Sequence, residues 1–60
     1  MKKSLTVTEV ASALKISRRQ VYYLVNMSEF EVFRIGASLR IVSDSVSDFI
    51  DRQLEEYENS

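Results

Sequence analysis

The side chains best suited to a chemical task are five polar residues in one short stretch of the chain, from Arg18 to Asn26. The two arginines, Arg18 and Arg19, carry planar guanidinium groups that can hold phosphate through two hydrogen bonds. Tyr22 and Tyr23 supply hydroxyls for phosphate and rings for stacking, and the amide of Asn26 can read an adenine edge. These residue types predict non-covalent recognition of a nucleic acid. The competing interpretation is a solvated helix with surface arginines.

Covalent chemistry is disfavoured by the composition. The 60 residues include no histidine and no cysteine, so the commonest general bases, nucleophiles and zinc ligands are missing. The sequence also has a single glycine, which excludes a glycine-rich loop that cradles phosphate. We therefore expect a protein that is not an enzyme and that uses no metal and no cofactor.

A helix that positions the five polar residues is predicted from Ser17 to Asn26. Ser17 is a good N-cap, and Gln20 three residues later completes a capping box. The helix macrodipole favours negative charge in the first turn, so the two arginines there are locally unfavourable. A phosphate bound at the helix N-terminus would make them favourable. Ser17 is itself a candidate DNA contact. Helical spacing turns three apolar residues inward, Val21, Leu24 and Val25.

An earlier helix is predicted over Val7–Leu14, with Thr6 as its N-cap and Glu9 completing a capping box. Only two residues separate this helix from the cap of the next one. Two amphipathic helices joined by so tight a turn form a helix-turn-helix, whose second helix enters the major groove of DNA. Lys15 in the turn would cost about 1 kcal/mol in a left-handed conformation. Its ammonium is a candidate phosphate contact, or it is an ordinary surface lysine.

The region after residue 30 alternates apolar and polar residues as a β-hairpin does. Its glycine, the only one in the chain, starts a predicted three-residue loop over 36–38. With that loop, Arg34 lies opposite Arg40, and like charges in such a pair destabilise the hairpin. An anion between them would remove the repulsion, so this pair is a second candidate phosphate contact; otherwise both splay into water. Six apolar residues are expected in the core, Met27, Phe30, Phe33, Ile35, Leu39 and Ile41.

The last predicted helix runs from Asp44 to Tyr57, with Ser43 or Asp44 as its cap. An Asp48–Arg52 pair four residues apart is expected on its surface. The apolar face of this helix is predicted to cover the open side of the hairpin and to complete the core.

Charge is divided unevenly along the chain, although the net charge is only −1. Residues 1–42 carry seven basic and three acidic side chains, which gives +4. Residues 43–60 carry one basic and six acidic side chains, which gives −5. This division predicts a basic working face and an acidic tail that points away from nucleic acid.

The length predicts one small domain over residues 1–60, with an ordered core over about 5–57 and a frayed start over 1–4. A chain of this size buries only about 60% of its unfolded surface, so its stability is marginal. No apolar run follows the N-terminus, and we expect neither a signal peptide nor a membrane segment. The lack of cysteine fits a cytosolic protein.

With helix, tight turn, helix, hairpin and helix in this order, the sequence resembles the excisionase-type winged helix-turn-helix DNA-binding domains, which are related to the mercury-resistance-regulator (MerR-like) fold. The resemblance covers residues 5–51 and implies a fold that is mainly α with a small β-hairpin, the wing. The segments that carry it are Leu5–Ala11 with Leu14, Ile16–Tyr22, and Phe33–Gly36 with Leu39–Ile41.

The sequence departs from the pattern of these domains at several positions. They commonly have glycine where this chain has Lys15 and Ser28, and proline where it has Glu31. Their wing tip often carries a second glycine, a basic residue and an aromatic, where this chain has Ala37–Leu39. Because the tip of the wing is uncharged, strong insertion into the minor groove of DNA is not expected.

The resemblance implies a protein of a phage or mobile element that binds double-stranded DNA in the bacterial cytoplasm, at the nucleoid. A unit of this size looks like an excisionase, also called a recombination directionality factor. Such proteins bind repeated sites beside an attachment site, associate cooperatively, bend DNA and help a tyrosine or serine integrase favour excision. No small-molecule ligand is implied. A small transcriptional repressor is the alternative, and a protein-interaction module using the acidic last helix is a third possibility.

Overall fold

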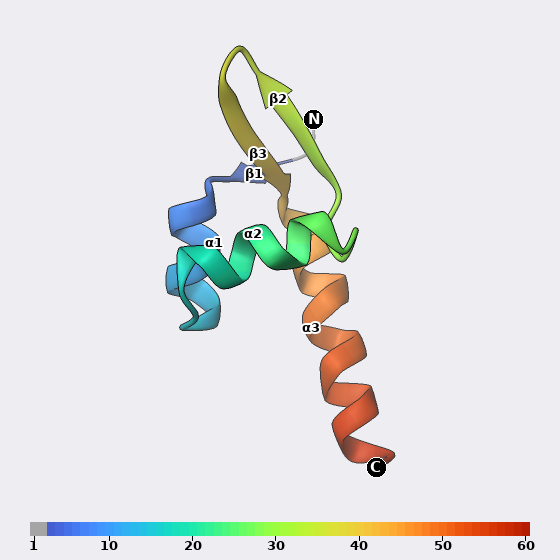
Figure 1. The fold of residues 1–60 in the computed structure, drawn as a ribbon. Coiled ribbons are helices and arrows are strands. Elements are labelled where there is room, and N and C mark those ends of the chain that lie inside the picture. Colours follow the sequence, from blue (N-terminus) through green and yellow to red (C-terminus); the bar gives the residue numbers. More distant parts are fainter. Residues whose placement is uncertain (1–2) are drawn as a thin grey trace.

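The computed structural model describes residues 3–60 as three helices and a three-stranded antiparallel sheet (Figure 1). α1 and α2 form the helix-turn-helix, and the hairpin of β2 and β3 projects beyond them as the wing. The fold is thus the predicted winged helix-turn-helix. Within residues 3–60, no helix has the length and apolar character needed to cross a membrane. The elements are β1 (Ser4–Leu5), α1 (Val7–Leu14), α2 (Arg18–Asn26), β2 (Val32–Ile35), β3 (Ser38–Val42) and α3 (Ser43–Glu58).

The helix-turn-helix begins with the capping box that the sequence predicts. The Glu9 amide donates to Thr6 Oγ1 (3.1 Å), and the Thr6 amide donates to Glu9 Oε1 (2.9 Å). The hydrogen bond from the Thr6 backbone is the main cause that lowers the pKa of the Glu9 carboxyl below its ordinary value, followed by the Thr6 side chain and, more weakly, the charge of Arg40. Glu9 is therefore ionised at neutral pH and fixes the start of α1 beside the sheet.

The cap of α2 follows the prediction in its first half. Ser17 Oγ accepts a hydrogen bond from the Gln20 amide (3.0 Å), so the serine is the N-cap. The Gln20 side chain, expected to return to the cap, instead lines a groove beside α3. The inward side of α2 is as predicted, with Val21 fully buried and Leu24 and Val25 half-buried.

Among residues 3–60, two residues other than glycine adopt a left-handed backbone conformation, Lys15 (φ 56°) and Ser28 (φ 60°). Lys15 ends α1 in the turn before α2, and Ser28 lies in the connection that follows α2. These are the two positions at which the resembled domains commonly have glycine. A side chain with a Cβ costs about 1–2 kcal/mol in this conformation. The turn between α1 and α2 and the connection after α2 therefore both carry backbone strain.

Replacing Ser28 with glycine is expected to raise the free energy of unfolding by about 0.5–1 kcal/mol, because relief of the strain exceeds the added entropy of the unfolded chain. Lys15→Gly is expected to do the same. Urea unfolding followed by circular dichroism would measure both changes. Ser12→Gly is the control, since this residue lies inside α1 and the change should lower the free energy of unfolding by about 0.5 kcal/mol. A loss at Ser28 as large as that at Ser12 would contradict the argument.

The sheet contains a strand that the sequence analysis did not predict. β1 pairs antiparallel with β3, with Ser4 opposite Val42. The Ser43 amide also donates to the Lys3 carbonyl (2.9 Å). The expectation of a frayed start is therefore wrong for residues 3 and 4, and its other two positions, 1 and 2, lie outside the described residues. A strand of two residues is too short to show alternation in a sequence.

The hairpin has a different register from the predicted one. Its loop is two residues long, because Ser38 belongs to β3 and pairs with Ile35. Gly36 supplies the positive φ (59°) that such a short loop needs at its first position. Arg34 consequently lies opposite Leu39, and Arg40 lies opposite Phe33. The expected Arg34–Arg40 pair is therefore wrong, since a shift of one residue puts the two arginines on opposite faces of the sheet.

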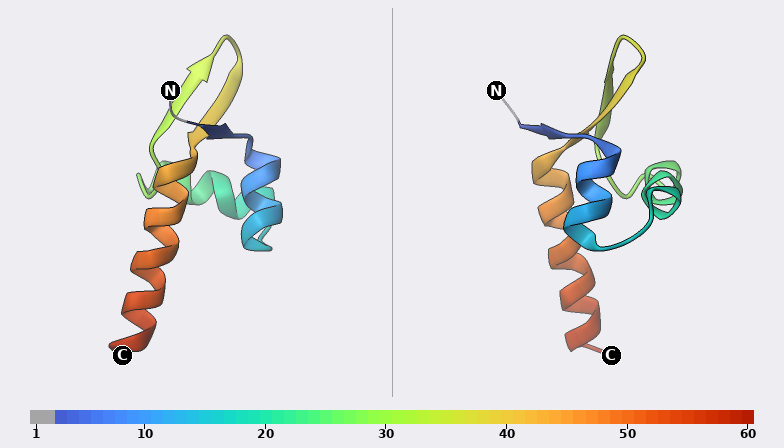
Figure 2. Two further views of the ribbon diagram at one scale, coloured as in Figure 1. Left: turned by 180° about the vertical axis from the view of Figure 1, so that it is seen from behind. Right: turned by 90° about the vertical axis from the view of Figure 1, so that its left-hand side faces the viewer.

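The core is small and lies between the helices and the C-terminal end of β3. Phe30 is buried there as predicted, with its ring edge-on to Phe49 (centroids 5.1 Å apart, planes at 69°). Three other residues expected inside are exposed, namely Met27, Phe33 and Ile35. The wing projects from the body of the protein, and Phe33 and Ile35 on β2 remain exposed (Figure 2). Seven residues form the buried cluster, Val7, Val10, Ala11, Val21, Phe30, Ile41 and Val46.

The last helix starts one residue earlier than predicted and without the predicted cap. Its N-cap is Val42, which makes no side-chain cap hydrogen bond, and Ser45 Oγ donates to the Val42 carbonyl (2.7 Å). Arg52, expected to pair with Asp48, donates to the Glu29 carbonyl (3.3 Å) and lies 3.6 Å from its carboxylate. α3 extends away from the wing instead of covering it, because β3 leads directly into the helix (Figures 1 and 2).

Candidate DNA-binding surface

The outward face of α2 presents three of the predicted contact residues. At 100° per residue, the helix places Arg19, Tyr23 and Asn26 along the centre of the face opposite Val21. All three are exposed, and Tyr23 keeps 55% of its surface accessible. A cation, an aromatic ring and an amide are therefore displayed in one row, which matches the groups used to contact base edges and the backbone of DNA.

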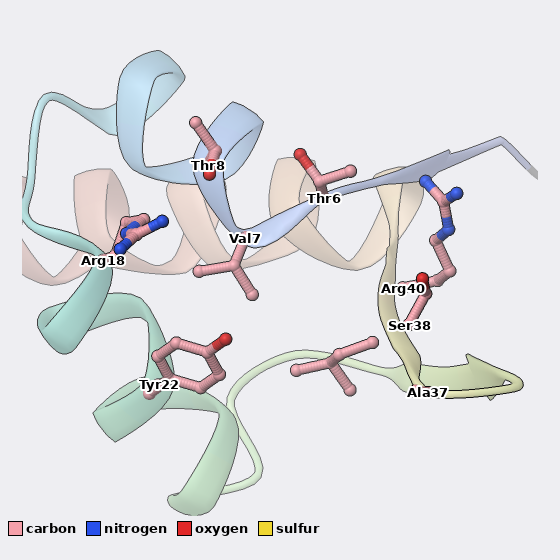
Figure 3. Close-up of a pocket in the computed structure, with 9 residues that line it drawn as sticks. Thr6, Val7, Thr8, Arg18, Tyr22, Ala37, Ser38 and Arg40 are labelled. Atoms are coloured by element: carbon pink, nitrogen blue, oxygen red, sulfur yellow. The ribbon is translucent and has the colours of Figure 1, made fainter.

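Two further predicted residues, Arg18 and Tyr22, lie on the flank of α2 that faces the wing. A cleft of about 300 Å³ separates this flank from β3. Figure 3 shows Arg18 and Tyr22 on one side of the cleft and Ser38 and Arg40 on the other. The polar residues of the cleft come from the start of α1, from α2 and from β3, and they are Thr6, Thr8, Arg18, Tyr22, Ser38 and Arg40.

Arg40 is the most constrained cation of this surface. Its side chain is only partly exposed, and its Nε is buried without a hydrogen-bond partner among the described residues. A buried donor left unpaired costs about 1–3 kcal/mol. The charge of Arg40 also reaches Glu9, whose carboxyl pKa it helps to lower. Arg40 thus combines a buried, unpaired Nε with a charge that acts on Glu9.

The other predicted contacts lie outside the cleft. Lys15 is exposed in the turn between the two helices, and Ser17 is exposed at the start of α2. The Ser17 hydroxyl accepts the cap hydrogen bond and keeps its own proton to donate. Arg34 is exposed on β2, on the face of the sheet opposite to that of Arg40. The structure therefore brings together Arg18, Tyr22 and Arg40, and it separates Arg34 from them.

The cleft also contains polar residues that the sequence analysis did not assign to the surface. The sequence predicts Thr6 only as a helix cap and Ser38 only as part of the hairpin loop. Thr8 is exposed in the first turn of α1. The available signal was a pair of threonines at a helix N-terminus, where backbone amides and hydroxyls bind anions. Their proximity to Arg40 depends on the path of β3, which the sequence does not reveal.

Comparison with known proteins agrees with this fold. The family described as "Helix-turn-helix domain" matches residues 4–54. A protein named "Excisionase" from Streptomyces ambofaciens is 40% identical over 52 residues, which are 87% of this chain and 84% of that protein. Proteins provisionally named as DNA-binding in two strains of Mycobacterium tuberculosis are 38% identical over 47 residues. Those residues are 78% of this chain and 60% of each relative.

No solved structure gives a match. The family match nevertheless covers most of the chain, and it includes α1, α2, the wing and most of α3. The order of these elements is the one expected from the resemblance in the sequence. The chain therefore belongs to the helix-turn-helix domain family, as an excisionase-type winged helix-turn-helix DNA-binding domain.

Proposed function

We propose that this chain is an excisionase, a DNA-binding architectural protein that helps an integrase remove a phage or mobile element from a chromosome. The observation that carries the proposal is the cleft, where Arg18 of α2 and Arg40 of the wing lie on facing walls. Two arginines that line one open cleft can bind phosphates of a DNA strand. The 40% identity to a protein named as an excisionase supports a role in excision beyond DNA binding alone.

In this proposal α2 lies in the major groove and its outward residues contact the bases. An arginine can form two hydrogen bonds with a guanine, and an asparagine can form two with an adenine. We therefore assign base contacts to Arg19 and Asn26. Tyr23 lies between them and packs against a base or a sugar. Specificity would then depend mainly on this row.

The remaining contacts are assigned to the phosphate backbone. Arg18, Tyr22 and Arg40 hold the strand that passes through the cleft. The other three touch phosphate outside it, and they are Lys15 and Ser17 at the helix-turn-helix and Arg34 on the wing. Phosphate contacts fix the position of a protein on the duplex without reading sequence.

Excision requires DNA to be bent so that distant sites meet, and the proposed role is to stabilise that bend. Bending a site costs about 1–6 kcal/mol. One small module buries about 600–1,000 Å² on DNA, so several copies on repeated sites would share the cost. The proposed partners are therefore double-stranded DNA, further copies of the chain, and a tyrosine or serine integrase. The proposed location is the nucleoid in the bacterial cytoplasm, and no catalytic step is assigned to the chain.

A gel shift across the attachment region of the element that encodes the protein tests this role. Several successive shifted bands beside the core site are expected for the wild type. The Arg18→Ala/Arg19→Ala double variant should lose them while keeping its helical circular dichroism. A single shifted band over a promoter would assign the protein to transcriptional repression instead. No binding at low salt by a folded protein would overturn the proposal.

A further inference from the structure

A second groove lies on the other flank of α2, away from the cleft. It has a volume of about 570 Å³ and runs between α2 and the middle of α3. Its walls contain two glutamines and six apolar residues, Leu14, Ile16, Leu24, Phe49, Ile50 and Leu54. We refer to it as the apolar groove.

The apolar groove continues as an exposed row of side chains along α3. Ile50 is 44% exposed, Leu54 is 55% exposed, and Tyr57 beyond them is 78% exposed. Single exposed apolar residues are common, but a contiguous row marks a binding surface. Figures 1 and 2 show that the last turns of α3 extend past α1 and α2. Nothing within residues 3–60 therefore covers this end of the row.

Acidic side chains border the row on both sides. At 100° per residue, Asp51 and Glu58 lie along one edge of it, and Glu56 lies along the other. All three are exposed. Residues 43–60 carry six acids against one base, and that base, Arg52, is paired with Glu29. The groove is thus apolar at its centre, and the side of its rim that α3 forms is negative.

We propose that the apolar groove binds an amphipathic helix of a basic partner protein. A helix seats apolar anchors spaced i, i+3, i+4 and i+7 in such a groove. Anchors of this kind would pack on Leu24, Phe49 and Leu54, while lysine or arginine residues beside them would face the acidic rim. Charge complementarity raises the rate of association and excludes partners of the wrong sign.

A second copy of the chain fits the same groove less well. Symmetric pairing through α3 would bring together two segments that each carry a charge of −5. Opposed like charges cost energy, and in an interface they disfavour the pair. DNA is excluded from this surface for the same reason. A positively charged helix is the occupant that satisfies both the apolar centre and the negative rim.

The proposed docking site does not depend on the excisionase role. It lies on the flank of α2 opposite Arg18 and Tyr22, so occupation of the groove leaves the cleft open. Peptide binding can be measured without DNA, and its failure would leave the proposed DNA-binding function untouched. The reverse also holds, because a protein that fails to bind DNA could still bind the peptide.

The test uses synthetic peptides as long as α3, 16 residues. The first carries leucines on one helical face and lysines elsewhere, the second has the same composition with the leucines scattered, and the third has glutamates in place of the lysines. Fluorescence anisotropy of labelled peptides, at about 150 mM salt to weaken unspecific attraction, gives the affinities. We expect saturable binding of the first peptide, binding at least about tenfold weaker for the second, and none for the third.

Three variants locate the binding. Leu54→Gln removes an exposed apolar side chain from the groove. It should lower the affinity for the first peptide by about tenfold and leave the circular dichroism spectrum unchanged. Asp51→Asn should also weaken it, whereas Asp48→Asn, an equal charge change on the far side of α3, should not. Equal affinity for the first two peptides, or an unaffected Leu54→Gln variant, would overturn the proposal. Sedimentation showing a wild-type dimer that Leu54→Gln dissociates would overturn it in favour of a second copy.

Discussion

Alanine in place of Arg18 is expected to weaken DNA binding by about 10- to 100-fold, because a hydrogen bond between charged groups contributes about 1.5–3 kcal/mol. The side chain lies on the flank of α2 at the cleft, where no wall residue is acidic. Loss of one phosphate contact should also lower the slope of log affinity against log salt by about 0.9. Titration of a labelled duplex at several salt concentrations measures both quantities.

Arg52→Ala is the matched control for this change. It removes the same charge from α3, at a surface ion pair with Glu29 that contributes only about 0–1 kcal/mol to stability. Its DNA affinity and its salt slope should both equal those of the wild type. If the two alanine variants lost the same affinity, overall charge would explain the effect and the cleft would not be the site of contact.

The second large effect is expected in the core, where Ile41→Ala should unfold much of the protein without denaturant. Ile41 is fully buried in β3 and lies opposite Leu5 on one side and Val32 on the other. Removing such a side chain costs about 2–5 kcal/mol, and one small core rarely supplies more than about 3–5 kcal/mol. Thermal unfolding followed by circular dichroism would show the loss as a low or absent transition.

The chain contains a matched isoleucine for comparison. Ile35 lies at the end of β2 in the wing and is 61% exposed. Ile35→Ala should change the free energy of unfolding by no more than about 0.5 kcal/mol. Similarly large losses for the two variants would mean that the wing, like the base of the sheet, is part of the folded core.

The helix-turn-helix could be predicted in detail because its signals are local. The Thr6–Glu9 box and the Ser17 cap each involve residues three apart, and helical spacing assigns the inward face of α2. The left-handed conformation of Lys15 also fits the sequence, since only two residues separate α1 from the N-cap of α2. Interactions of this range need no knowledge of the rest of the fold.

The wing and its surroundings could not be predicted as well, because their arrangement depends on distant contacts. A loop of two or three residues was compatible with the position of Gly36, and the choice decides which face every following side chain occupies. Alternation in Phe33 and Ile35 suggested a buried face, although the wing has no neighbour to cover it. The cleft itself joins Arg18 to Arg40 across 22 positions of sequence, and no local pattern links them.

β3 continues directly into α3, so the two elements should move together as one rigid arm. β3 ends at Val42 and α3 begins at Ser43, so no flexible loop can absorb a change in the angle of the hairpin. α3 has 16 residues, a length of about 24 Å at 1.5 Å per residue. A tilt of the arm by about 10° would move the end of a rod of that length by about 4 Å. A force that tilts the wing would therefore displace the C-terminal end of α3.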